Sequence, residues 1–178
     1  MTYRVTFVCT GNICRSPMAE HVFRKYAEDA GLPVEGARSA RQRVPATDGV
    51  PSGARLSVDS SGTDGWHVGD PADHRTVQTL RRNGYTSAHE ARQFQREWFD
   101  HYDLIIALDE GHHRALLALA SDEDHRNKVR LLRSYDPQAV DLNVPDPYYG
   151  GRAGFEECLE LIEAAMPGLL DEVRKELP

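Results

Sequence analysis

The sequence is short of cysteine, of basic charge and of long apolar stretches. Its 178 residues include three cysteines, an odd number that does not suit a disulfide framework and favours a reducing compartment. The formal net charge of −7 argues against nucleic acid as a partner, because phosphate backbones are bound by basic faces. No run of about 18 apolar residues is present, so the sequence predicts neither a membrane span nor a membrane partner.

The overall composition is that of an ordinary globular protein. Hydrophobic residues make up 40% and charged residues 28%, and 178 residues are enough to bury a substantial core. The first residues, Met1–Arg4, pass directly into an apolar run and leave no room for a secretory signal. We therefore expect one cytoplasmic domain over residues 1–178, either an enzyme or a binding domain.

The most informative stretch begins where that apolar run ends. Residues 5–8 are typical of a short buried strand, and residues 9–17, CTGNICRSP, follow it. Pro17 then opens a helical pattern, because proline is tolerated at the first position of a helix. A strand, a short loop and a helix start direct several backbone N–H groups and the positive helix end at one point. The sequence thus predicts a site for an oxyanion.

Within this loop the residue types add nucleophilic chemistry to anion binding. Cys9 is a good nucleophile as a thiolate, which a helix N-terminus, a cation or the Ser16 hydroxyl would favour. Arg15 can hold two phosphate oxygens in a bidentate fork, which lysine cannot. Gly11 allows the backbone to approach an anion closely, and Asn12 can hold a strained loop by bonding to its own neighbours. The alternative is that Cys9 is only a buried residue at the end of a strand.

The rest of the chain alternates apolar strands with helical patterns. Strands are expected at 56–60, 104–108 and 129–132, and helices at 17–30, 70–82, 95–99, 109–120 and 155–175, with Asp70 capping the second helix and Pro71 at its first position. This alternation predicts an α/β fold of three layers, with a four-stranded parallel sheet between helices. Ligands of such sheets bind at the carboxyl ends of the strands. We therefore expect Cys9, Asp109 and the loop after Leu132 to gather at one mouth.

One segment fits neither pattern. Residues 35–57 are rich in glycine, proline, serine, threonine and arginine and show almost no apolar periodicity. They predict a long exposed loop insertion, locally basic, which is either functional or simply tolerated at the surface.

The loop sequence resembles the signature of a known family. CTGNICRSP at 9–17 is similar to the signature loop of the low-molecular-weight protein tyrosine phosphatases of bacterial type. Further matches are SSGT at 60–63, WHVG at 66–69, PAD at 71–73 and DPYYG at 146–150. The resemblance covers nearly the whole chain except the 35–57 insertion, and it implies the α/β fold with the phosphate-binding loop after the first strand.

The resemblance also implies a mechanism without metal or cofactor. Cys9 would attack phosphorus to give a phosphocysteine intermediate. The phosphate would be held by the loop, whose residues are Thr10, Gly11, Asn12, Ile13, Cys14, Arg15 and Ser16. Asp146 would protonate the leaving phenolate and then deprotonate the attacking water. Alternatively, Asp146 is only a turn residue before proline; its rival as the acid, Asp109, is better explained as a helix cap.

The same resemblance assigns the substrate cleft. Trp66, Tyr148 and Tyr149 would form aromatic walls, with His67 close by, and a deep aromatic slot favours phosphotyrosine over the shorter phosphoserine. Protein-arginine phosphatases of the same family carry threonine at the position of Ile13, so Ile13 favours a phosphotyrosine-containing protein as the substrate.

Two competing functions use the same loop. A thioredoxin-coupled arsenate reductase on this fold needs two further cysteines in the middle of the chain, and residues 15–157 contain none. A phosphotyrosine-binding module without activity is opposed by the presence of Cys9, Arg15 and Asp146.

The remaining cysteines and histidines receive separate interpretations. Cys14 prompts the hypothesis, suggested by the family, that peroxide forms a reversible Cys9–Cys14 disulfide; the alternative is a small side chain packed behind the loop. Cys158 is expected in the core. The adjacent His112 and His113 lack metal-ligand spacing and are expected to be solvated.

Overall fold

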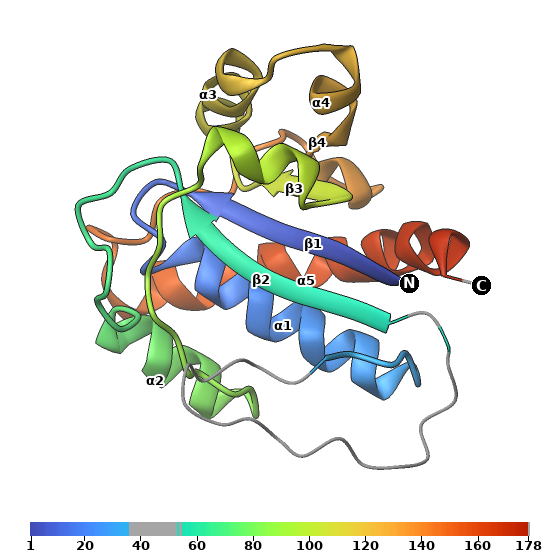
Figure 1. Ribbon diagram of the computed structural model, residues 1–178. Coiled ribbons are helices and arrows are strands. Elements are labelled where there is room, and N and C mark those ends of the chain that lie inside the picture. Colours follow the sequence, from blue (N-terminus) through green and yellow to red (C-terminus); the bar gives the residue numbers. More distant parts are fainter. Residues whose placement is uncertain (36–52, 54, 178) are drawn as a thin grey trace.

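The computed structural model describes residues 1–35, 53 and 55–177 (Figure 1). Most of the predicted 35–57 insertion therefore lies outside the described residues. Its last part was predicted wrongly, because a strand already begins at Arg55 and pairs with the first strand of the sheet.

In the described residues, four parallel strands form one sheet in the order β2-β1-β3-β4. The strands are β1 (Thr2–Cys9), β2 (Arg55–Gly62), β3 (Leu104–Ala107) and β4 (Val129–Leu131). In register, Val5 of β1 lies opposite Val58 on one side and Leu104 on the other. This confirms the predicted sheet. Because β1 is paired on both sides, its carboxyl end opens at the middle of the sheet edge, on the side away from both termini (Figure 1).

Helices cover both faces of the sheet, as predicted for three layers. On one face α1 (Arg15–Asp29), α2 (His74–Arg82) and α5 (Gly151–Glu176) enclose the larger core, while α3 (Glu110–Leu119) and α4 (Glu123–Lys128) lie over the other face (Figure 1). Short 3-10 helices span Arg96–Asp100 and Leu132–Tyr135. Successive strand residues point to opposite cores: Phe7 joins the first and Val8 the second.

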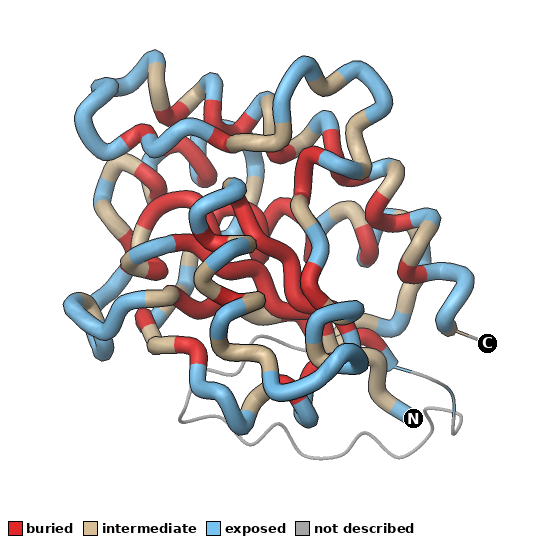
Figure 2. The backbone as a smooth tube through the Cα atoms, turned by 90° about the horizontal axis from the view of Figure 1, so that it is seen from above, coloured by how far each residue is buried: buried red, intermediate tan, exposed pale blue. Residues whose placement is uncertain are grey.

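The sheet is the most buried part of the molecule. Figure 2 shows the strands as a buried centre ringed by exposed loops. All four residues of β3 are buried, as its continuous apolar run predicts. In the described part of the chain, no helix combines the length and the apolar character needed to cross a membrane.

The starts of α1 and α2 differ from the prediction. Helix α1 begins at Arg15 rather than Pro17, which then occupies the third position, where its missing N–H is again one that has no partner in the helix. Helix α2 begins at His74, and its cap is Asp73, whose side chain accepts from the Arg75 N–H. Asp70 was the wrong cap, because its backbone bonds to His67 and Ala91 in a preceding turn.

Two other elements differ. Helix α4 was not predicted, since none of its residues is buried and it therefore shows no apolar periodicity. Helix α5 begins at Gly151, earlier than the expected Phe155, and continues through Pro167.

Candidate active site

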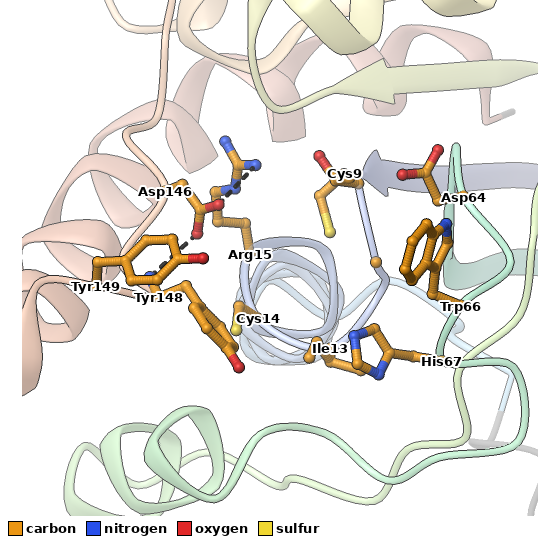
Figure 3. Close-up of a pocket in the computed structure, with 12 residues that line it drawn as sticks. Cys9, Ile13, Cys14, Arg15, Asp64, Trp66, His67, Asp146, Tyr148 and Tyr149 are labelled. Carbon is orange, nitrogen blue, oxygen red and sulfur yellow. Dashed lines mark hydrogen bonds and ion pairs between the residues drawn. The ribbon is translucent and has the colours of Figure 1, made fainter.

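A pocket of about 250 Å³ opens at the carboxyl end of β1 (Figure 3). Its lining residues are Cys9, Thr10, Gly11, Ile13, Cys14, Arg15, Asp64, Trp66, His67, Asp146, Tyr148 and Tyr149. The loop 10–14 forms its floor, and the segments 64–67 and 146–149 face each other across it. Cys9, Arg15, Asp146 and the four predicted cleft residues therefore meet in one place, whereas Asn12 and Ser16 of the predicted phosphate loop do not line the pocket.

Cys9 is the last residue of β1, and its side chain is almost fully buried. Its Sγ lies 2.9 Å from the Ser16 hydroxyl oxygen, in the first turn of α1. The same hydroxyl lies 3.2 Å from the Ser61 carbonyl oxygen. Because Ser16 has only one proton to donate, it can give this proton either to the carbonyl or to the sulfur once the sulfur is a thiolate. Ser16 thus lies beneath the floor, where it can donate a hydrogen bond to the sulfur of Cys9, and it does not line the pocket.

Asn12 holds the loop from below in a left-handed conformation, with φ of 56°. Its side chain is fully buried and donates to the hydroxyls of Ser16 and Ser60 at 2.8 and 3.0 Å. Its side-chain oxygen accepts from the Arg92 backbone N–H at 2.9 Å, and its backbone carbonyl accepts from His89 at 2.6 Å. The expectation that Asn12 bonds to its own neighbours was therefore incomplete, because three of these four partners come from distant segments.

The end of β2 presses directly against the same loop. A Cβ at Gly62 would lie 2.5 Å from the Thr10 carbonyl oxygen and 3.1 Å from the Asn12 nitrogen, so no side chain fits there. The next two backbone N–H groups, of Thr63 and Asp64, donate to the carbonyls of Cys9 and Thr10 at 2.8 and 3.0 Å. The loop is thus fixed by backbone contacts as well as by side chains.

Arg15 is buried and enters the pocket from the start of α1. Its Nη1 donates to Asp109 at 2.8 Å and to the Val144 carbonyl at 2.9 Å. Its Nη2 lies 3.9 Å from the Asp146 carboxylate. With both Nη1 hydrogens engaged behind the pocket, the guanidinium is oriented with Nη2 towards Asp146 (Figure 3).

Asp109 therefore has a second role besides its predicted one. It caps α3, accepting from the His112 N–H at 2.8 Å, and it also pairs with Arg15. Burial tends to raise the pKa of this carboxyl, but the hydrogen bond from His112 and the charge of Arg15 outweigh burial and leave the pKa below its usual value. Asp109 remains a carboxylate that orients Arg15.

The prediction that His112 is solvated was wrong. It is buried, and its Nε2 lies 2.8 Å from the Thr10 hydroxyl and 3.4 Å from Arg15 Nη2. Burial and the charge of Arg15 lower its pKa to about 4, so the ring is neutral at physiological pH. Adjacent helix residues point about 100° apart, which is why His113 is more exposed while His112 faces the site.

Asp146 lies beside Arg15 with its carboxylate turned towards the pocket (Figure 3). Its Oδ1 accepts from the Tyr148 N–H at 3.1 Å, a turn contact of the kind expected for aspartate before proline. Its side chain is 52% exposed, in contrast to that of Arg15. Both interpretations of this residue, turn former and pocket carboxylate, fit its position.

The predicted cleft residues all line the pocket but differ in exposure. Trp66 and Tyr149 are 89% and 92% exposed, and Tyr148 is 41% exposed. His67 pairs with Asp70 at 3.1 Å and lies against Gly11, where a Cβ would meet its ring at 3.0 Å. The aromatic side chains thus form an open rim rather than closed walls.

The two remaining thiols lie in different surroundings. Cys14 lines the pocket, and burial, followed by the charges of Asp73 and Cys9, raises its pKa to about 12. Cys158 is buried on α5, which confirms its predicted place in the core. All three cysteines are free thiols.

Sequence reasoning missed several residues of the site. Asp64 lines the pocket, while His89, Arg92 and Gly62 support the loop from below. The one available signal was position, since Gly62 ends a strand and Asp64 follows it closely. Within the described residues, no group of three or more histidine, cysteine or acidic side chains is arranged to hold a metal ion.

The chain is similar to known proteins both in sequence and in fold. A family model described as low molecular weight phosphotyrosine protein phosphatase matches residues 4–46 and 41–178. A low molecular weight protein-tyrosine-phosphatase from Streptomyces coelicolor is 56% identical, over 99% of this chain and 97% of its own length. A crystal structure of a protein tyrosine phosphatase from Entamoeba histolytica, with Hepes in the active site, has a TM-score of 0.81 at 28% identity and 98% coverage of both chains. A mutant of the arginine phosphatase YwlE has a TM-score of 0.75 at 24% identity over 97% of both chains, which is a likeness of fold alone.

Proposed function

Since the chain belongs to the low-molecular-weight phosphotyrosine protein phosphatase family, we propose that it hydrolyses phosphotyrosine in proteins with Cys9, Arg15 and Asp146 as its catalytic residues. It is a protein-tyrosine phosphatase by family, and phosphoproteins are its substrates. The residue assignment rests on one observation: a buried thiol and a guanidinium at the two ends of the loop, and a carboxylate from a distant segment, line one pocket.

In the first step, Cys9 attacks phosphorus as a thiolate. A sulfur–phosphorus bond forms while the bond from phosphorus to the tyrosine oxygen breaks, and Asp146 donates its proton to the leaving phenolate. The Ser16 hydroxyl, 2.9 Å from the sulfur, can direct its proton at the thiolate before attack and after release. In the resting enzyme, the Ser16 hydroxyl can therefore stabilise a Cys9 thiolate by donating a hydrogen bond to it.

In the second step, water attacks the phosphocysteine. Asp146, now a carboxylate, takes a proton from that water, and the thiolate of Cys9 leaves as phosphate forms. The same group therefore acts as acid and then as base, which returns it to its starting protonation state. The side chain of Asp146 is half exposed at the rim, where water has access.

The negative charge of the transferring group is balanced by the protein alone. Arg15 and the backbone N–H groups of the loop 10–15 would hold the three equatorial oxygens, where fixed donors stabilise the transition state most. Asp109 and the Val144 carbonyl fix Nη1 of Arg15 in advance, so little reorganisation is needed. No step requires a metal ion.

The substrate class follows from the pocket. Its aromatic rim and its floor below the surface suit a phenyl phosphate, whose ring can span the distance to Cys9. Ile13 lines the floor at the position where arginine phosphatases of this family carry threonine. We propose that Ile13 favours phosphotyrosine, and that the enzyme acts as one domain in the cytoplasm, where its three thiols stay reduced.

The test compares three substrates in a chelating buffer: p-nitrophenyl phosphate, a phosphotyrosine peptide and a phosphoarginine peptide. We expect turnover of the first two and at least about 100-fold lower kcat/KM on phosphoarginine. Cys9→Ser should abolish turnover, whereas Cys158→Ala, which removes a thiol from the core, should retain it. Faster hydrolysis of phosphoarginine would overturn the substrate class, and activity in Cys9→Ser would overturn the nucleophile.

A further inference from the structure

We propose that Arg75 is a positioning residue for Asp146, because it joins the segment that carries the acid to the floor of the pocket. Arg75 is the second residue of α2 and does not line the pocket itself. The inference rests on the proposed role of Asp146 as general acid. It extends that role by naming what holds a half-exposed carboxylate in place.

One side of Arg75 contacts the segment 146–149, which carries Asp146. Its Nη1 donates to the Tyr148 carbonyl at 2.7 Å. Its guanidinium carbon lies 5.0 Å from the centre of the Tyr148 ring and 4.7 Å from that of Phe155, so the planar group contacts both aromatic residues. The N–H of the same Tyr148 donates to Asp146 Oδ1 at 3.1 Å. Arg75 thus fixes the residue whose amide fixes the carboxylate.

The other side of Arg75 is anchored to the phosphate loop through Asp73. Arg75 Nε and Nη2 each donate to one carboxylate oxygen of Asp73, both at 3.0 Å, in a bidentate pair. The Asp73 backbone N–H donates to the Ile13 carbonyl at 2.9 Å, within the floor. The hydrogen bond from Arg75 is also the main reason that the pKa of Asp73 lies below its usual value. A continuous chain of contacts therefore runs from Ile13 to Asp146.

The arrangement needs arginine rather than any cation. Three nitrogens of one planar group serve two partners in fixed directions, and the same group lies over two aromatic rings. Lysine has a single ammonium and cannot donate to both partners from such a fixed fork. A displacement of about 1 Å in a catalytic group can cost on the order of 100-fold in rate.

The test measures kcat/KM for a series of aryl phosphates whose leaving phenols differ in pKa. A displaced acid matters most for poor leaving groups, so Arg75→Met should steepen the dependence of kcat/KM on leaving-group pKa. We expect a loss of about tenfold for phenyl phosphate, below the ~100-fold that a misplaced group can cost, and a few-fold loss for p-nitrophenyl phosphate. Arg75→Lys, which keeps the charge and guards against a folding defect, should resemble Arg75→Met.

A double mutant and a control separate positioning from a general structural effect. In the Asp146→Ala background, Arg75→Met should cause little further loss, because the group it positions is gone. Arg82→Met removes another α2 arginine, one paired with Glu156 at 2.8 Å, and should leave the slope unchanged. An equal loss for all leaving groups, or a full loss in the Asp146→Ala background, would overturn the positioning role of Arg75. If Asp146→Ala itself leaves the slope unchanged, the acid assignment falls first and the Arg75 proposal falls with it.

Discussion

The floor and the rim of the pocket differ in burial and in the number of internal contacts. Four residues that form or support the floor, Cys9, Asn12, Arg15 and Ser16, are at most 4% exposed, whereas the rim residues Trp66 and Tyr149 are 89% and 92% exposed. The side chains of Asn12, Arg15 and Ser16 each have at least two partners at hydrogen-bond distance, and the Cys9 sulfur has one, the Ser16 hydroxyl. The comparison indicates that the floor is fixed by contacts inside the protein, while the rim side chains face solvent, where we expect them to contact a substrate protein.

Asp146 links the rim to the floor. Its substitution should have the largest effect on kcat/KM. It is a rim residue by exposure, but its proposed role is to transfer protons at the floor. Asp146→Ala should lower kcat/KM for phenyl phosphate by about 10² to 10⁴-fold, the usual contribution of general acid catalysis, and p-nitrophenyl phosphate should lose less. The measurement is the leaving-group series, with the exposed α5 carboxylate Asp171→Ala as the control. Equal losses for both substrates would assign the acid role to another residue.

Asn12 tests how far the floor depends on its internal contacts. Asn12→Ala removes three side-chain hydrogen bonds, each worth about 1 kcal/mol, and leaves a residue with a Cβ at φ of 56°. We expect a lower Tm and a loss of about 10 to 100-fold in kcat/KM, because misplaced catalytic groups lose rate steeply. Asn12→Gly tolerates the backbone conformation and should fall between Asn12→Ala and the parent in Tm. Parent-like activity of Asn12→Ala would show that the loop holds its shape without this side chain.

Cys14 lies in the floor and lines the pocket. Its substitution tests the hypothesis that a Cys9–Cys14 disulfide protects Cys9 from irreversible oxidation. If peroxide converts Cys9 to a sulfenic acid, the Cys14 thiol can condense with it, giving a disulfide and water. After peroxide and then dithiothreitol, the parent should regain several-fold more of its starting activity than Cys14→Ser does. Each variant is normalised to its own untreated activity. Equal recovery would mean that Cys14 is only a packed side chain, which remains the alternative interpretation.

Trp66 represents the rim, and its removal should have the smallest effect on the chemical step. At 89% exposure, Trp66→Ala should change the free energy of unfolding by less than about 0.5 kcal/mol. We expect at most a two- to threefold change in kcat/KM for p-nitrophenyl phosphate and about a five- to tenfold loss for a phosphotyrosine peptide, since aromatic anchors contribute to protein recognition. Equal changes on both substrates would show that the rim does not select the partner.

The features that were predicted correctly are those encoded locally. The apolar run 104–108 and the loop 9–17 carry their signals within a few residues, so the parallel sheet and the place of Cys9 and Arg15 could be predicted. Helix α3 follows the cap Asp109 for the same reason. Local chemistry therefore indicated where the site lies and what it contains.

The features that were missed depend on contacts between distant segments. Both Asp70 and Asp73 are suitable caps, and the choice is made by backbone bonds from Asp70 to His67 and Ala91. The orientation of His112 depends on which face of α3 meets Thr10, which spacing alone does not decide. The partners of Asn12 lie 48 and 80 residues further along the chain, at Ser60 and Arg92.

The fully buried Asn12 has a consequence for engineering. Its left-handed backbone is held by Ser60, His89 and the N–H of Arg92, none of which belongs to the signature sequence. A peptide that copies residues 9–17, or a graft of them into another strand–helix junction, would bring the reactive groups without their supports. The loop needs at least the end of β2 and residues 89–92 to keep its shape, so we expect that the activity cannot be transplanted as a linear motif.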